Sequence, residues 1–326
     1  MFILYSLEQN SDLHQNNLID FMKIRIIVFF LFILAGNGLK AQYYFYDGNY
    51  YESDVVYEIG GSMGAMNAFT DLGGRKGIGK KFVKDFNFKN TQFCGSIFFS
   101  AVYKNEFALR LEGTFGNVGA YDSILASVKD NSQERYYRNL SFRSSIAEIA
   151  LMAEFHPFYI FGNYNDDHYP PSVSPYLVAG IGYFHFNPQA KLNGNFVDLQ
   201  PLHTEGEGFS EYPNAKNYKL SQINFPVGIG ARYDVSAIIN LRAEIVTRFL
   251  TTDYLDDVSG RYIDPSVFAN YLSGVQLNEA LLLNDRHKPG AETAHPGGIR
   301  GNPKNNDSYI TFNIKLGLTL GRERRN

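Results

Sequence analysis

The stretch ITFNIKLGLTL, Ile310–Leu320, alternates strictly between apolar and polar side chains. Its even-numbered positions are all apolar, and its odd-numbered positions include Lys315. This period of two predicts a β-strand with one apolar face. A soluble sandwich would bury that face in a core, whereas a membrane barrel would turn it to lipid and place Lys315 inside. The rest of the chain has to distinguish these two arrangements.

Seven further segments show the same alternation, which makes eight predicted strands in all. Most are about ten residues long, and a tilted strand needs roughly 9–11 residues to cross the hydrocarbon layer of a membrane. The eight segments are Val55–Met66, Phe93–Tyr103, Phe107–Gly116, Ser144–His156, Pro175–Phe186, Ser221–Tyr233, Leu241–Leu250 and Ile310–Leu320.

Charged residues in these strands all fall on the polar faces, and the two signs balance. Five acids face five bases there, and the apolar faces of these strands carry no charge. The narrow interior of an eight-stranded barrel requires such matching, because charges removed from water must be paired. The predicted interior charge network consists of Glu58, Arg110, Glu112, Glu148, Glu154, Arg232, Arg242, Glu244, Arg248 and Lys315.

The connections between strands alternate between short and long. Residues 104–106, 157–174 and 234–240 form the shorter set, although 157–174 is long for a turn, and the longer set is 67–92, 117–143, 187–220 and 251–309. Outer-membrane barrels have short periplasmic turns and long external loops. We therefore predict an all-β protein, an eight-stranded antiparallel up-and-down transmembrane barrel in the outer membrane, with both termini on the periplasmic side.

Aromatic residues stand near the strand ends on the predicted outer face, as in the aromatic girdles of outer-membrane barrels. The second and fifth strands fit the alternation less well, because apolar residues occupy their predicted inner face. Glycines on neighbouring strands could make room for rings there. The predicted girdle residues are Tyr57, Tyr103, Phe107, Phe155 and Tyr233 on the short-turn side, and Phe93, Phe115, Tyr183 and Phe249 toward the other side.

The N-terminal region has the pattern of a secretory signal peptide. Lys23 and Arg25 precede an apolar run that ends near Ala35, and Ala41 is a plausible cleavage point. We interpret residues 1–41 as an upstream extension plus a signal peptide beginning at Met22, and residues 42–326 as the mature barrel. The net charge of −3 argues against binding to nucleic acid, and a single cysteine excludes an internal disulfide framework.

Three segments resemble chemical motifs without fulfilling them. GRKGIGKK at 74–81 lacks the Ser or Thr of a phosphate-binding loop. Asp166, Asp167 and His168 are adjacent but lack the spacing of a calcium loop. His203 and Glu205, with Ser210 or Asp198 nearby, contain the residue types of a hydrolytic set, but they lie away from the predicted strand ends. We predict no cofactor, no metal and no enzymatic activity.

Several longer stretches resemble the PorG-like outer-membrane barrels of the type IX secretion system. They are IGGSMGAMNAFTDLGGRKGIGK at 59–80, RNLSFRS at 138–144, NGNFVDLQPLHTEGEGFSEYP at 193–213, TDYLDDVSGRYIDPSVF at 252–268 and RGNPKNNDSY at 300–309. The resemblance implies an eight-stranded component of the secretion machinery, associated with the periplasmic ring of PorK and PorN. It implies no catalytic residues.

A periplasmic partner could reach only the short-turn side of the barrel. The predicted contacts there are Phe158, Tyr159, Ile160 and Phe161, since aromatic residues are enriched in interface cores, together with Arg322, Arg324 and Arg325. A self-packed turn is the alternative for 157–174. Two other functions stay open: a lipid-modifying or hydrolytic barrel enzyme that would use His203 and Ser210, and a small passive channel.

Overall fold

The computed structural model describes residues 54–73, 88–127, 133–162, 173–291 and 294–320. Several of the predictions above concern residues outside these ranges and stay predictions. They are the extension and signal peptide over 1–41, the basic segment 74–81, the triplet Asp166, Asp167 and His168, and the arginines Arg322, Arg324 and Arg325.

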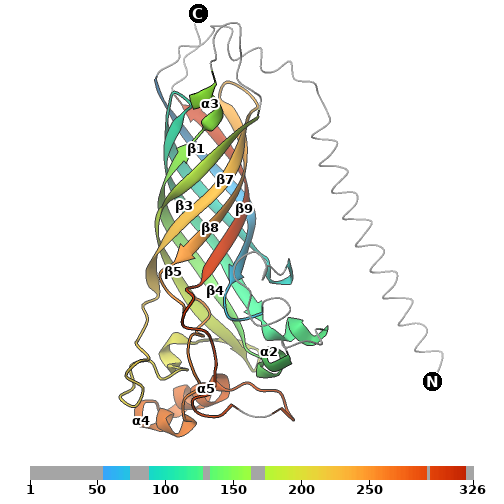
Figure 1. Ribbon diagram of the computed structural model, residues 1–326, viewed down its shortest axis with the longest axis vertical. Helices are drawn as coiled ribbons and strands as arrows, with labels where there is room; N and C mark the ends of the chain where they lie inside the picture. Colours follow the sequence, from blue (N-terminus) through green and yellow to red (C-terminus); the bar gives the residue numbers. More distant parts are fainter. Residues whose placement is uncertain (1–53, 74–87, 128–132, 163–172, 292–293, 321–326) are drawn as a thin grey trace, which may run out of the picture. The chain divides into compact units, whose positions relative to one another are not determined.

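Eight long antiparallel strands close into a barrel, which confirms the predicted fold class (Figure 1). Neighbouring barrel strands pair in chain order, β5 pairs with β7 beyond the short β6 hairpin, and β1 pairs with β9 to close the barrel. The barrel strands are β1 (Val55–Phe69), β2 (Gln92–Tyr103), β3 (Phe107–Tyr121), β4 (Ser141–Phe155), β5 (Val173–Leu192), β7 (Ser221–Asp234), β8 (Ile239–Leu250) and β9 (Ser308–Leu320).

One end of the barrel carries the short connections and is called here the short-turn end. Lys104 and Asn105, in the three-residue connection from β2 to β3, have positive φ of 49° and 58°, as the central residues of a tight hairpin turn between twisted strands require. The connection between β7 and β8 is similarly tight, with the Val235 N–H donating to the Ile239 carbonyl at 2.9 Å. The connection after β4 begins with helix α3 (Pro157–Phe161). Among the described residues, no helix is both long enough and apolar enough to span a membrane.

The outer face of the barrel is apolar and exposed. Met63, Ile97 and Phe93 are 71 %, 68 % and 67 % exposed, and the other outward side chains of the strands follow the same pattern. A water-soluble barrel would bury these residues, because exposed apolar patches of this extent are rare on soluble monomers. Lipid is the solvent that matches this surface.

The strands differ from the prediction in their extent. β1, β3 and β5 continue beyond the apolar band to Phe69, Tyr121 and Leu192, because backbone pairing persists where the side chains are no longer lipid-facing. Ile310 has the outward parity but is only 6 % exposed, unlike the following apolar residues of β9. The short strand β6 (Asn195–Asp198) pairs with the extended end of β5.

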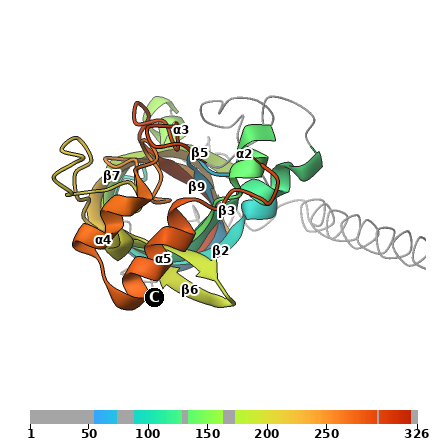
Figure 2. The same cartoon turned by 90° about the horizontal axis from the view of Figure 1, so that it is seen from below.

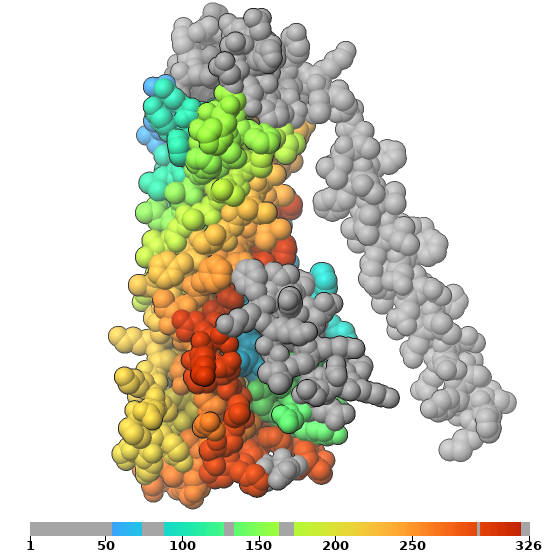
Figure 3. Space-filling model, viewed as in Figure 1, coloured from blue at the N-terminus to red at the C-terminus, as the bar shows by residue number. Residues whose placement is uncertain are grey.

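The long connections fold together at the opposite end of the barrel and form what we call the loop cap (Figures 2 and 3). The cap comprises the described residues of 70–91, 122–140, 193–220 and 251–307. Its helical segments are η3 (Phe88–Asn90), η4 (Asp122–Ser127), α2 (Gln133–Arg138), η5 (Gln200–Leu202), η6 (Pro265–Val267), α4 (Phe268–Tyr271) and α5 (Gly274–Asn284).

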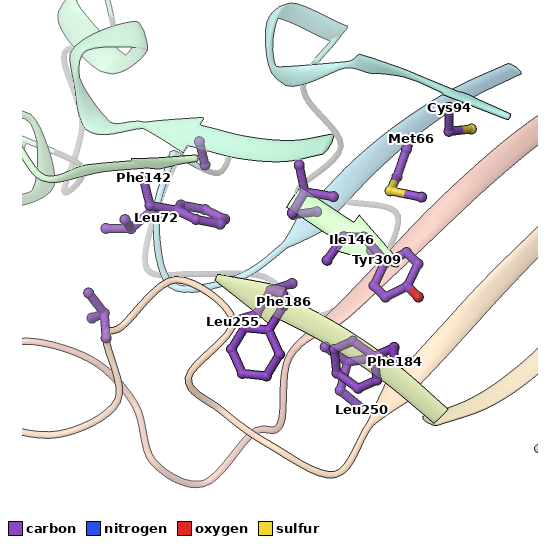
Figure 4. Close-up of a cluster of buried hydrophobic side chains, with 14 of the residues drawn as sticks. Met66, Leu72, Cys94, Phe142, Ile146, Phe184, Phe186, Leu250, Leu255 and Tyr309 are labelled. Carbon is purple, nitrogen blue, oxygen red and sulfur yellow. The ribbon is translucent and has the colours of Figure 1, made fainter. Parts of the chain in front are cut away.

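Two apolar clusters hold this end together. The first joins barrel and cap: Phe184, Phe186 and Tyr309 from the strands pack in one cluster with Leu72 and Leu255 from the loops (Figure 4). The second lies within the cap, where Phe209, Phe268 and Leu283 pack with the end of β5. The cap is therefore a folded part of the molecule with its own core.

Candidate functional site: the lumen and the loop cap

The inner faces of six strands supply all ten charged residues of the predicted network. Each is at most 5 % exposed, although most lie at mid-strand in a protein whose outer surface is apolar. β2 and β5 contribute no charge; their inner faces carry Phe98, Val102, Tyr176, Phe184 and Phe186, all at most 3 % exposed. The strands that fitted the alternation least well therefore provide the rings of the lumen.

The network near the short-turn end centres on Glu58 of β1. Arg232 Nη2 lies 2.8 Å from Glu58 Oε1, and Arg242 contacts the other oxygen of the same carboxylate. Arg242 Nη1 also lies 3.0 Å from Glu154 Oε2, which His156 Nε2 approaches at 3.3 Å. Two arginines on β7 and β8 thus neutralise carboxylates on β1 and β4 across the lumen.

The middle of the lumen is organised by Arg110 of β3. Its guanidinium lies 2.6 Å from Glu154 Oε1, 2.8 Å from Glu244 Oε2 and 3.0 Å from Glu112 Oε2. Lys315 Nζ lies 2.6 Å from Glu112 and 3.0 Å from Glu244. The lysine of the alternating stretch Ile310–Leu320 therefore lies inside the barrel, bound to two carboxylates.

The network toward the loop cap is smaller. Arg248 Nε lies 3.3 Å from Glu148 Oε1, and Glu148 Oε2 accepts hydrogen bonds from the Tyr309 hydroxyl at 2.5 Å and the Asn224 amide at 2.6 Å. Arg248 also donates to the Thr311 hydroxyl. The rings of Phe184 and Tyr309 lie beside this pair, 6.2 Å apart between centroids, where the first apolar cluster begins.

Aromatic rings fill the space between the charges. The Phe98 ring centroid lies 5.4 Å from the Arg242 guanidinium carbon and 5.5 Å from Lys315 Nζ, both within cation–π range. Two glycines make the room: a Cβ at Gly60 would lie 2.5 Å from the Phe98 ring, and a Cβ at Gly230 would lie 2.2 Å from the Tyr176 ring. The lumen is thus packed with side chains, as expected for eight strands.

The loop cap contains a second polar centre that the sequence did not reveal. Arg300 Nη1 lies 3.0 Å from Glu205 Oε1 and donates to the Asp257 carbonyl at 2.5 Å. Glu205 also accepts from the backbone N–H groups of Ser259 and Gly260, at 3.0 and 2.7 Å. These contacts fasten the 193–220 loop to two parts of the 251–307 loop.

Arg138, at the end of α2, ties the remaining loops together. Its guanidinium makes a bidentate contact with Asp122, with Nε 2.8 Å from Oδ2 and Nη2 3.0 Å from Oδ1. The same side chain donates to the Arg300 carbonyl at 2.6 Å and the Asp71 carbonyl at 3.0 Å. The planar fork of arginine suits such multiple contacts. One side chain therefore connects three loops.

Acids outnumber bases in the buried part of the cap. Burial raises the pKa of Asp253 to about 9 and, despite the nearby Arg300, the pKa of Asp257 to about 6. Burial and neighbouring carboxylates hold the pKa values of Asp256, Asp307 and Glu207 well above their usual range. Among the described residues, no group of three or more His, Cys, Asp or Glu is arranged to hold a metal ion.

The residues considered for hydrolysis lie in the cap but do not form a catalytic set. Ser210 Oγ lies 2.7 Å from the Tyr271 hydroxyl and 3.1 Å from Glu211, and Glu205 is bound to Arg300. The His203 ring packs beside Phe209 at 5.5 Å, and Asp198 accepts from Asn187 and Gln189 on the β5–β6 hairpin. Each of these residues is therefore bound to neighbours other than those a triad would require.

The predicted partner residues 158–161 form helix α3 at the short-turn end. Phe158 and Phe161 are 45 % and 79 % exposed, whereas Tyr159 and Ile160 are half-buried. The Tyr159 ring lies 6.4 Å from the His156 ring inside the lumen mouth. The four residues therefore do not share one surface.

Comparisons with solved structures show weak likenesses to small outer-membrane barrels. Neisserial surface protein A is 11 % identical with a TM-score of 0.36, and the match covers 82 % of this chain and 97 % of that one. Ail of Yersinia pestis, solved with the heparin analogue sucrose octasulfate, is 10 % identical with a TM-score of 0.32, over 82 % and 97 %. A major outer-membrane protein of Thermus thermophilus is 12 % identical with a TM-score of 0.35, over 81 % and 99 %.

No protein-family model matches the chain, and no curated protein matches it. The assignment of the fold therefore rests on the strands themselves: closed antiparallel pairing, a lipid-compatible outer face and a charged, filled interior. The chain is an eight-stranded β-barrel of the outer-membrane type.

Proposed function

We propose that this protein is a non-enzymatic outer-membrane component of the type IX protein secretion machinery. The observation that carries the proposal is the filled lumen beneath a folded loop cap, which suits a structural subunit better than a pore. The resemblance to PorG-like barrels adds the secretion system. The residues that fasten the cap, among them Arg138, Glu205, Asp257 and Arg300, lie within the very stretches that carry that resemblance.

In this proposal the short-turn end faces the periplasm and meets the ring of PorK and PorN. The exposed ring of Phe158 and the C-terminal arginines Arg322, Arg324 and Arg325 are the candidate contacts. Tyr159, Ile160 and Phe161 lie in the same helix but are not assigned to the ring in this proposal. The loop cap then faces the outside of the cell. The even number of strands puts the start of β1 and the end of β9 on the same side, which in this proposal is the periplasmic side.

Deletion of the gene tests the proposal. Export of type IX cargo should stop, and an affinity-tagged chain extracted in mild detergent after crosslinking should recover PorK and PorN. Matched variants sharpen the experiment: replacing Phe158 by Ser should weaken recovery of the ring, whereas replacing the equally exposed Phe196 on the β6 hairpin should not. Normal secretion without the protein, together with its recovery alone, would refute the proposal.

Two other functions give different results. A passive channel would show steady conductance in planar bilayers, which the ion-paired lumen gives no reason to expect. A hydrolytic barrel would lose its activity when His203 and Ser210 are replaced while assembly stays intact. No contact in the described part of the chain favours either function over the structural one.

A further inference from the structure

Helix α3 is a single turn that places aromatic rings on opposite sides of the barrel wall. It follows directly on β4, whose last residue, Phe155, faces outward, and it starts at Pro157 after the inward-facing His156. Backbone hydrogen bonds from Tyr159 and Ile160 to the His156 carbonyl fix the turn, at 3.1 and 3.3 Å. The orientation of α3 is therefore set by the end of the strand.

The inner side of α3 covers the mouth of the lumen. The Tyr159 ring packs edge-on against His156, and His156 in turn stacks on Tyr176 with 5.1 Å between centroids. Arg232, which is 5 % exposed, lies in the same mouth bound to Glu58. Within the described chain, Tyr159 thus continues the series of lumen side chains beyond His156 and Tyr176.

The outer side of α3 continues the lipid-facing surface. The Phe161 ring lies edge-on to Phe155 at 6.3 Å, and Phe155 lies edge-on to Phe107 at 5.7 Å. Phe107 belongs to the outward aromatic residues of the short-turn end, with Tyr103 on the neighbouring β2 and Tyr57 on β1. Phe161 is 79 % exposed, and nothing in the described chain covers it.

We propose that Phe161 is a membrane anchor, inserted at the boundary between headgroups and acyl chains of the leaflet at the short-turn end. Aromatic side chains are enriched at that depth in membrane proteins. The occupant of this surface is phospholipid, because Phe161 extends an aromatic row that is already lipid-facing. The helix then closes the lumen with Tyr159 and holds its position in the bilayer with Phe161. The assignment rests on the membrane barrel and is independent of any ring partner.

The absence of tryptophan from the chain allows a clean test. Single-tryptophan variants Phe161→Trp, Phe115→Trp and Val275→Trp are reconstituted into phosphatidylcholine vesicles with acyl chains brominated close to the headgroup or close to the methyl end. Phe115 lies on the outer face of β3 and is 59 % exposed, and Val275 lies on α5 of the cap and is 72 % exposed. Folding of each variant is checked by the heat-dependent mobility shift on electrophoresis.

Phe161→Trp should show blue-shifted emission and be quenched by lipid brominated near the headgroup, to an extent comparable with Phe115→Trp. It should resist the aqueous quencher acrylamide, which should quench Val275→Trp. Acrylamide quenching of Phe161→Trp like that of Val275→Trp, with no effect of brominated lipid, would overturn the anchor and assign the ring to water or a protein partner. Failure of brominated lipid to quench Phe115→Trp would overturn the lipid-facing surface from which the anchor is argued.

Discussion

The lumen and the loop cap both bury many charged residues, but they neutralise them differently. Five acids and five bases meet in the lumen, and each acid lies within ion-pair distance of at least one base. The buried part of the cap, among the described residues, has seven acids against Arg138 and Arg300: Asp122, Asp253, Asp256, Asp257, Asp307, Glu205 and Glu207. In the lumen, each buried carboxylate is neutralised by a buried cation. In the cap, which lies outside the membrane, burial raises the pKa of several carboxyl groups, so that they can be neutralised by a proton instead.

This contrast follows from the surroundings of each region. A charge within the hydrocarbon zone has no access to water when the network opens, so an unpaired residue is costly and a complete match is required. Cap loops can open to water locally, and a carboxylate there can keep its proton at neutral pH. The lumen should therefore respond strongly to substitution, and the cap should respond to pH.

Replacing Arg110 by Met should have the largest effect. The change removes the guanidinium that pairs with Glu112, Glu154 and Glu244. Removing one partner of a buried ion pair lowers the free energy of unfolding by about 3–5 kcal/mol. Urea unfolding of the purified barrel in detergent micelles measures the loss. Lys191→Met, which removes the same charge from an exposed position on β5, should change stability by no more than about 0.5 kcal/mol. Equal effects of the two variants would mean that the lumen network is not buried.

Replacing Arg300 by Gln should loosen the cap and leave the barrel intact. Glu205 and the Asp257 carbonyl lose a charged donor, which costs about 2 kcal/mol locally. Hydrogen exchange of residues 253–262 should accelerate, while the urea midpoint of the strands stays the same. Lys304→Gln, at an exposed position of the same loop, is the matched control. A shift of the strand midpoint as large as that of Arg110→Met would remove the distinction between the two regions.

Lowering the pH should tighten the cap. The folded state raises the pKa of Asp253 to about 9 and that of Asp257 to about 6, above the ordinary value of 3.8. The folded cap therefore binds protons that the opened cap releases, so its stability is greatest at acidic pH and falls as the pH rises through these values.

Between pH 8 and pH 5, exchange of the cap amides, corrected for intrinsic rates, should slow by at least about tenfold, the change of about 1.4 kcal/mol that protonation of Asp257 alone supplies. The Asp253→Asn variant should show less of this dependence, because its side chain does not titrate. Faster corrected exchange at acidic pH would contradict the protonated state of these carboxylates.

The sequence predicted the barrel and the composition of its interior because both follow from one rule, alternation along a strand. Parity places Arg110 and Glu244 in the lumen from sequence alone, but their contact joins residues 134 apart and depends on the diameter and shear of the barrel. The inward rings of β2 and β5 were visible as exceptions, and the close approach at Gly60 and Gly230 makes room for two inward rings, those of Phe98 and Tyr176.

The cap could not be predicted in the same way, because irregular loops have no period from which to read burial. Asp257 and Arg300 look like solvated loop residues until four connections are brought together. Asp257 and Arg300 lie within the stretches that resemble the PorG-like family, and in the folded cap both take part in contacts that hold the loops together. The prediction that Ile310 is exposed was wrong for a related reason. The alternation along a strand shows which face of the barrel a side chain lies on, but it does not show whether another part of the chain covers that side chain.

Reactivity of the single cysteine tests the filled lumen most directly. Cys94 faces the lumen, is 1 % exposed and lies 3.4 Å from the Asn313 amide oxygen. In intact membranes a small water-soluble thiol reagent should leave Cys94 unmodified over hours, and unfolding in urea should make it react fully. Modification of the folded protein at the rate of the unfolded chain would show water throughout this part of the barrel and would contradict the account.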